Sequence, residues 1–83
     1  MSENVDHEHE LSAEEIRLVA TLDELGPATP IELALRVLEQ PDQLRPQLRK
    51  LRDAGWLDVK ERQGYETEIY FVSKKGRAAV AHR

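Results

Sequence analysis

The side chains best suited to recognition chemistry are four cations on one stretch of the chain. No acidic residue separates the first from the last, so the stretch carries a charge of +4: Arg45, Arg49, Lys50 and Arg52. An arginine can donate two parallel hydrogen bonds to a guanine base or to a phosphate, whereas a lysine acts as a compact point charge. These residues therefore favour contact with an anionic partner, nucleic acid above all.

The leucines of the same stretch predict the element that carries these cations. They are spaced at i, i+4 and i+7, as on one face of a helix: Leu44, Leu48 and Leu51. The three arginines repeat this spacing one residue later, so they share a neighbouring face. We therefore expect a helix over about 42–54 that buries its leucines, exposes its arginines and ends at Ala54-Gly55.

Pro46 is the anomaly in this helix, because a proline in a helix interior removes a backbone hydrogen bond at a cost of about 3 kcal/mol. The loss is smallest when the proline lies near the first turn. The helix is expected to begin between Pro41 and Gln43, and if Asp42 is its cap, Pro46 forfeits only the first hydrogen bond of the helix. A proline also restricts the residue before it, so we expect a late or kinked start, with Arg45 displaced from ideal helical geometry.

Two helices precede this one, and both begin with a capping box, in which a hydroxyl and a carboxylate satisfy each other's backbone N–H groups. The two boxes are Ser12 with Glu15, and Thr29 with Glu32. Gly26-Pro27 ends the first helix. The second helix has Pro30 at its first position and is expected to end near Leu38 or Glu39.

The hydrophobic period changes after Gly55. The segments 56–60 and 68–72 alternate or are rich in β-branched and aromatic residues, and a polar turn containing Gly64 separates them, so they predict a β-hairpin. Ser73 then caps a short final helix. Three helices, a hairpin and a helix are the order of an α+β winged helix-turn-helix domain, with a three-helix core and the hairpin as its wing.

Three motifs in register carry a resemblance to a known group of proteins. The first spans residues 29–55 without a gap, and the others are Leu44-Arg45-Pro46-Gln47-Leu48 with Gly55-Trp56-Leu57, and YFVSKKGR at 70–77. In these motifs the chain resembles the winged-helix domain of PadR-type transcriptional regulators, and it is also similar to the MarR type. The resemblance accounts for Pro46, because PadR-type recognition helices commonly begin with leucine, tyrosine and proline. Here Arg45 replaces the tyrosine, and we expect no C-terminal helical domain of the kind that pairs PadR-type subunits.

In a winged helix-turn-helix domain the third helix enters the major groove, and its early solvent-facing residues reach base edges. The residues expected to contact bases are Gln43, Arg45 and Arg49. Those expected to contact phosphates are Thr29, Lys50, Arg52 and Lys60. The wing, over about 61–67, is expected to reach DNA through Arg62, Gln63 and Tyr65. The predicted function is sequence-specific binding of duplex DNA by a small transcriptional regulator.

Charge is distributed unevenly along the 83 residues, and the formal total of −4 hides this. Residues 1–15 hold six of the 16 acids and no Lys or Arg, whereas residues 16–83 hold the other ten acids and all 12 Lys and Arg. We expect residues 1–11 to be an acidic disordered tail and residues 12–83 to be one domain. The acidic total therefore does not exclude DNA as a partner.

Several classes of function are disfavoured by what the sequence lacks. It has no cysteine, no glycine-rich phosphate loop and no histidine away from the chain ends, so we expect no enzyme activity, metal or cofactor. His7 and His9 stand among acids, which is only a weak metal-binding pattern. No segment is apolar enough to span a membrane and no apolar leader follows Met1, so we expect a cytoplasmic protein. No residue pattern specifies an effector pocket, so we expect no small-molecule ligand.

Two further expectations concern partners. Net acidity and small size also suit a winged-helix module that binds protein and does not bind DNA. Residues 69–72 place apolar side chains on both faces of the last strand, and one face must be covered by the final helix or by another subunit. We therefore expect a homodimer that reads two half-sites.

Deletion of residues 1–10 should tighten DNA binding several-fold at about 50 mM salt, because it removes anionic side chains that can screen the basic helix. Fluorescence-anisotropy titration of a labelled duplex measures this change. The effect should fade at higher salt, and an unchanged affinity at low salt would rule out a screening role for the tail.

Overall fold

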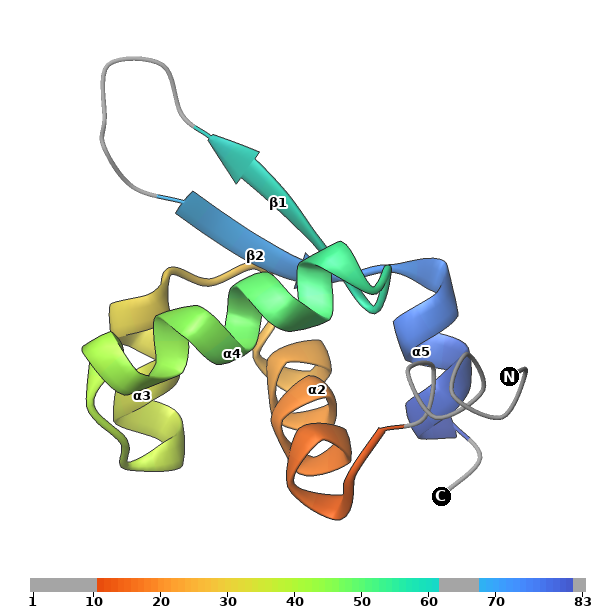
Figure 1. Ribbon diagram of the computed structural model, residues 1–83, viewed down its shortest axis with the longest axis horizontal. Helices are drawn as coiled ribbons and strands as arrows, with labels where there is room; N and C mark the ends of the chain where they lie inside the picture. Colours follow the sequence, from red (N-terminus) through yellow and green to blue (C-terminus); the bar gives the residue numbers. More distant parts are fainter. Residues whose placement is uncertain (1–10, 62–67, 82–83) are drawn as a thin grey trace, which may run out of the picture.

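The computed structural model describes residues 11–61 and 68–81, and its elements follow the predicted order (Figure 1). They are α2 (Ala13–Leu25), α3 (Pro30–Val37), α4 (Pro41–Asp53), β1 (Leu57–Glu61), β2 (Glu68–Val72) and α5 (Lys74–Ala81). The hairpin lies above α4 in this view, with α3 near one end of α4 and α5 beyond the other. This arrangement confirms the predicted α+β winged helix-turn-helix fold.

Residues 1–10 of the predicted acidic tail (1–11) and residues 62–67 of the predicted wing (about 61–67) lie outside the described residues, whereas Leu11 is half-buried and packs against the core. Within the described part of the chain, no helix has the length and apolar character that crossing a membrane requires.

Both predicted capping boxes form. The Glu15 N–H donates to Ser12 Oγ at 3.1 Å, and the Ser12 N–H donates to Glu15 Oε1 at 2.8 Å. The same reciprocal pair joins Thr29 and Glu32, at 3.2 and 2.8 Å. These bonds satisfy backbone donors that have no partner inside the helix, and so they fix where α2 and α3 begin.

Helix α4 begins at Pro41, the early limit of the predicted range. Gln40 is its N-cap, and the helix runs from Pro41 to Asp53 without interruption. The expectation of a late start is therefore wrong. Pro41 explains the difference, because its fixed φ suits the first helical position, where its missing N–H costs nothing. Pro46 lies in the second turn, where it removes the bond that the carbonyl of Asp42 would accept, and the helix continues through it.

The leucine face of α4 lies at the centre of the core. Its three members are at most 2% exposed: Leu44, Leu48 and Leu51. In the hairpin, Val59 pairs with Tyr70 and Leu57 with Val72, so these four side chains share one face, and Leu57, Tyr70 and Val72 are buried in the same core.

Ala28 adds to the free edge of β2. Its N–H donates to the Tyr70 carbonyl at 3.0 Å, and the Tyr70 N–H donates to the Ala28 carbonyl at 2.8 Å. The segment that enters α3 is therefore tied to the wing by backbone hydrogen bonds. On the other face of β2, Ile69 and Phe71 are half-buried and lie outside the main core cluster.

A tight junction closes the domain where β2 passes into α5. The Ser73 hydroxyl donates to the Gly55 carbonyl at 2.7 Å and accepts from the Gly76 N–H at 3.0 Å. Lys75 Nζ donates to the Ala54 carbonyl at 2.9 Å and lies 4.3 Å from the centre of the Trp56 ring. Gly76 and Lys75 of the 70–77 motif therefore have a structural role, since both hold α5 against the end of α4.

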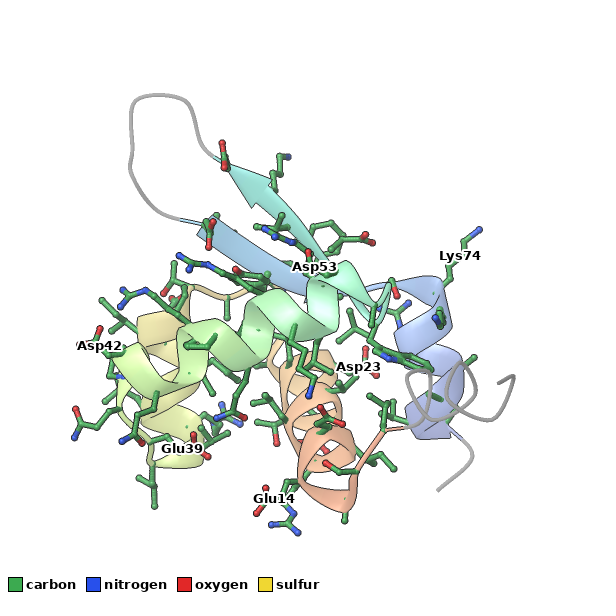
Figure 2. All side chains as sticks on the ribbon, in the orientation of Figure 1. Glu14, Asp23, Glu39, Asp42, Asp53 and Lys74 are labelled. Carbon is green, nitrogen blue, oxygen red and sulfur yellow. The ribbon has the colours of Figure 1, made fainter. Side chains whose placement is uncertain are left out.

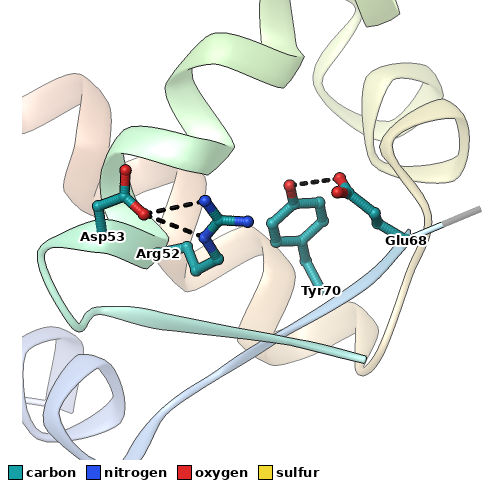
Figure 3. A network of polar contacts seen from close by, with 4 residues as sticks. All are labelled: Arg52, Asp53, Glu68 and Tyr70. Carbon is teal, nitrogen blue, oxygen red and sulfur yellow. Dashed lines mark hydrogen bonds and ion pairs between the residues drawn. The ribbon is translucent and has the colours of Figure 1, made fainter. Parts of the chain in front are cut away.

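Tyr70 is the largest fully buried side chain, and its hydroxyl donates to Glu68 Oε1 at 2.7 Å (Figure 3). Burial disfavours the phenolate, and the hydrogen bond to Glu68 favours the phenol. Together these raise the pKa of Tyr70 from 10.0 to about 12. Arg52 lies on the other side of the ring in Figure 3 and opposes the shift only in part.

Replacing Gly76 by alanine should lower stability by about 1–3 kcal/mol, the usual range for overpacking. A Cβ at this position would meet the Trp56 carbonyl oxygen, which is backbone and cannot move aside, and would approach Val72 Cγ1 to 2.9 Å. Urea denaturation of the full chain measures the change. At an uncrowded helix position the same change would raise stability by up to about 1 kcal/mol, because alanine has the higher helix propensity. A Gly76→Ala chain as stable as the wild type, or more stable, would therefore contradict the packing at this junction.

The Tyr70 phenol should titrate near pH 12. In the Tyr65→Phe variant Tyr70 is the one remaining tyrosine, so its phenolate absorbance can be followed alone. Because the folded pKa lies above the unfolded value, the stabilisation is complete below about pH 10 and is lost as the pH rises towards 12. Tyr70→Phe lacks the group and should lose less stability over that interval. A midpoint near pH 10 in the folded chain would show that Tyr70 is not buried in this way.

Candidate nucleic-acid interface

Helix α4 carries most of the cations that the sequence predicts to contact DNA, and two of these cations form ion pairs with aspartates of the same helix. Arg45 Nη1 lies 2.9 Å from Asp42 Oδ1, while Arg52 contacts Asp53 Oδ1 through Nε at 3.1 Å and Nη2 at 2.9 Å. The hydrogen bonds and charge of Asp53 raise the pKa of Arg52 above its usual value. Figure 2 shows Asp42 and Asp53 at opposite ends of α4. Acidic side chains therefore flank the basic helix at both ends.

Arg49 and Lys50 differ from these two arginines. Both side chains are exposed, and neither makes a hydrogen bond or ion pair with any residue in 11–61 or 68–81. They lie in the C-terminal half of the helix, with Lys50 in its last turn, on the side away from the buried leucines. The cations of α4 that are free to bind an external anion are therefore Arg49 and Lys50.

Gln43 is exposed, but it does not lie beside the arginines. Residues two apart on a helix do not face each other, so Gln43 and Arg45 point to different sides of α4. Gln47, one turn after Gln43, donates to the Gln43 carbonyl at 3.3 Å and to Glu39 Oε1 at 3.4 Å. The structure thus brings Arg45 and Arg49 together as possible base contacts and leaves Gln43 apart from them.

The remaining predicted contacts are more scattered. The Thr29 hydroxyl is engaged in the cap of α3, where it accepts from the Glu32 N–H and donates to Glu32 Oε1 at 3.2 Å, so it is not free to donate to a phosphate. Lys60 is exposed on β1 and pairs across the hairpin with Ile69. The three wing residues lie outside the described residues: Arg62, Gln63 and Tyr65.

Two glutamates at the base of the wing were not predicted as part of the site. Glu61 and Glu68 are direct cross-strand partners, and they share the hairpin face that carries Tyr70. Like charges directly opposite each other destabilise a hairpin, and the Tyr70 hydroxyl bonds to one of the two carboxylates. Only the strand register places these residues side by side, and the register depends on a turn whose length the sequence left open. The wing base therefore presents negative charge next to the basic helix.

A groove with a volume of about 380 Å³ lies between α2, α3 and α4. Its floor includes Leu18 and Val37, and its rim carries charges of both signs: Glu14, Arg17, Arg36 and Glu39. These charges balance, so the groove shows no preference for an anion or a cation. Among the described residues, no group of three or more His, Asp or Glu side chains is placed to hold a metal ion. His7 and His9 lie outside this part of the chain.

Comparison with known proteins shows the fold of the chain and does not assign it to a family. No protein-family model matches the chain, and no curated protein matches it. Among solved structures, it is similar to the multiple antibiotic resistance repressor MarR, with a TM-score of 0.78 and 16% identity over 88% of this chain and 54% of that one.

Two further solved structures are similar to the chain. A mutant of MarR from E. coli complexed with operator DNA gives a TM-score of 0.80 at 16% identity, covering 88% of this chain and 53% of the mutant. AbfR in a disulfide-bonded form gives 0.73 at 21% identity, covering 87% of this chain and 52% of AbfR. The chain thus spans about half the length of these proteins, and what it shares with them is the winged-helix fold.

Proposed function

We propose that this chain binds duplex DNA in a sequence-specific manner and acts as a small transcriptional regulator, with α4 in the major groove. The observation that carries the proposal is that Arg49 and Lys50 are exposed on the outer face of α4 and make no hydrogen bond or ion pair with another described side chain. In winged helix-turn-helix domains this is the helix that reads DNA. One solved structure with the same fold, the MarR mutant, is complexed with operator DNA.

The ion pairs suggest different roles for the cations of α4. Arg49 can present two parallel guanidinium N–H donors to a guanine without first breaking an ion pair, so it is the principal base contact in this proposal. Arg45 must exchange Asp42 for a base, which lowers its net contribution. Lys50 supplies a phosphate contact, which fixes position and carries no sequence information. Arg52, held by Asp53, adds positive charge near the backbone of the duplex.

Binding without sequence preference should be weak in this scheme. Few free cations face the duplex, and acids lie at both ends of α4 and at the wing base. Affinity from phosphate contacts falls steeply with salt, in proportion to the number of phosphates neutralised. Contacts from the wing, over about 61–67, complete the proposed interface through Arg62, Gln63 and Tyr65.

The finer parts of the proposal rest on the sequence. They are a PadR-type rather than a MarR-type relationship, a homodimer on two half-sites, a cytoplasmic location and the absence of catalysis. The motifs around Pro46 and at 70–77 support the first of these. The AbfR and MarR structures support the shared fold, and they do not distinguish between the two types.

The second candidate function is a winged-helix module that binds another protein. The observation that favours it is the acidic interruption of the basic surface, by Asp42 and Asp53 on α4 and by the glutamate pair Glu61 and Glu68. A duplex is repelled by such carboxylates, whereas a protein with its own cations is attracted to them.

Titration of the full chain against a random-sequence duplex at about 50 and 200 mM salt separates the two functions. The DNA proposal expects binding at the lower salt and an affinity that falls by at least tenfold at the higher one. Absence of binding at about 50 mM salt would refute DNA binding and favour the protein-binding module.

Substitutions on α4 test the assignment of roles, using a duplex selected from a random library by the wild-type chain. Arg49→Ala should reduce discrimination against mismatched sites by about 1–3 kcal/mol. Lys50→Ala should lower affinity equally for all sites and reduce the salt slope by about 1. Arg17→Ala is the matched control, because it removes from α2 an exposed arginine that makes no ion pair within 11–61 and 68–81, and it should leave binding nearly unchanged. Equal, sequence-independent losses from Arg49→Ala and Lys50→Ala would contradict the separate roles.

A further inference from the structure

One helix of the described chain has two apolar faces. The residues of α3 that face the core include Leu33 and Ala34, which are at most 3% exposed. Among residues 11–61 and 68–81, the large hydrophobic side chains that stay exposed all belong to this helix and its C-cap, at 55, 74 and 90% exposure: Ile31, Leu35 and Leu38. Their spacing of i, i+4 and i+7 places them in one row, here named the α3 stripe. A row of this kind marks an interaction surface more often than isolated apolar residues do.

The backbone of Leu38 makes this row harder to explain within one copy of the chain. Leu38 caps α3 in the left-handed region, at φ 61° and ψ 44°, where its N–H donates to the Ala34 carbonyl. Glycine adopts this conformation without strain and is the usual residue at such a position. Leucine pays a steric penalty there, and at 90% exposure its side chain recovers little by burial. An apolar contact outside the monomer would compensate for that penalty.

Charges along one border of the stripe indicate what the contact is. Glu32 and Arg36 are exposed, lie one turn apart on α3, and stand on the same side of the stripe. Arg36 makes no hydrogen bond or ion pair within the described residues, and Glu32 uses Oε1 for the cap of α3. When two copies of such a helix pack antiparallel about a two-fold axis, the same borders meet in opposite order. Glu32 of each copy then faces Arg36 of the other, and Ile31 faces Leu38.

We propose that the α3 stripe is a self-association surface, on which a second copy of this chain packs its own α3 antiparallel. The surface is self-complementary in both apolar pattern and charge, as a two-fold interface requires. Three side chains from each copy fall short of the roughly 800 Å² per partner of a standard interface, so the association is weak, with a dissociation constant on the order of 100 µM. The stripe lies on α3 and not on α4, and its test does not depend on DNA binding.

Sedimentation equilibrium of the full chain, without DNA, measures this association directly. Leu35→Glu should weaken it at least tenfold, because it buries a carboxylate in the centre of the stripe. Ala78→Glu is the matched control, since it adds the same charge at an exposed position on α5 and should leave association unchanged. Absence of self-association of the wild-type chain up to about 1 mM, or equal effects of the two variants, would overturn the proposal.

Leu38→Gly separates association from folding because its two effects have opposite signs. Removing the left-handed strain should raise the melting temperature of the dilute monomer, while removing an apolar side chain from the stripe should weaken association severalfold. A glycine variant that associates as tightly as the wild type would exclude Leu38 from the interface.

A charge exchange tests the antiparallel pairing. Arg36→Glu and Glu32→Lys should each weaken self-association, because each brings like charges together across the interface. Mixing the two variants should restore association as a heterodimer, in which every acid again faces a cation. Thermal melts of each variant alone check that the loss of the Glu32 cap leaves the domain folded. Failure of the mixture to associate, with both variants folded, would overturn the pairing.

Discussion

The burial of one leucine face on α4 sets the constraint that the rest of the domain obeys. Leu44, Leu48 and Leu51 are the only large apolar side chains of that helix, and all three are spent on the core. A domain this small buries a modest fraction of its surface, so it cannot spare this face for a ligand. The outer side of α4 faces solvent, and every residue there is polar, charged or proline. The same burial aligns α4 with the hairpin through Leu57 and Tyr70.

The electrostatic character of the outer surface follows from local pairing more than from net charge. Asp42 and Asp53 neutralise the two arginines nearest the helix ends, and Arg49 with Lys50 remains as a compact positive centre. Such a centre gives weak non-specific binding to DNA and favours a partner that has an anionic group at the matching position. It suits specificity better than affinity, since repulsion at the flanks penalises partners that are out of register.

Local signals in the sequence predicted much of the fold, because they act over three or four residues. The capping boxes at Ser12 and Thr29 and the leucine spacing on α4 all appear in the structure as expected. The start of α4 was misjudged because two prolines compete there, and Pro41 at the first position outweighs the cost of Pro46. The Glu61–Glu68 pair and the close approach of Gly76 to Trp56 could not be foreseen, because each joins segments that only tertiary structure brings together. For the site, the sequence predicted which cations lie on α4, but not which of them are already paired.

The backbone bridge between Ala28 and Tyr70 has a consequence for the order in which the chain folds. It joins residues 42 positions apart, whereas α3 and α4 pack through contacts between close neighbours in the sequence. Closing a long loop costs more chain entropy than closing a short one, so non-local pairing slows folding. We therefore expect the helical pair to assemble early and the bridge to form with the final closure of the sheet. The element that presents Arg49 would then be in place before the wing that stands beside it.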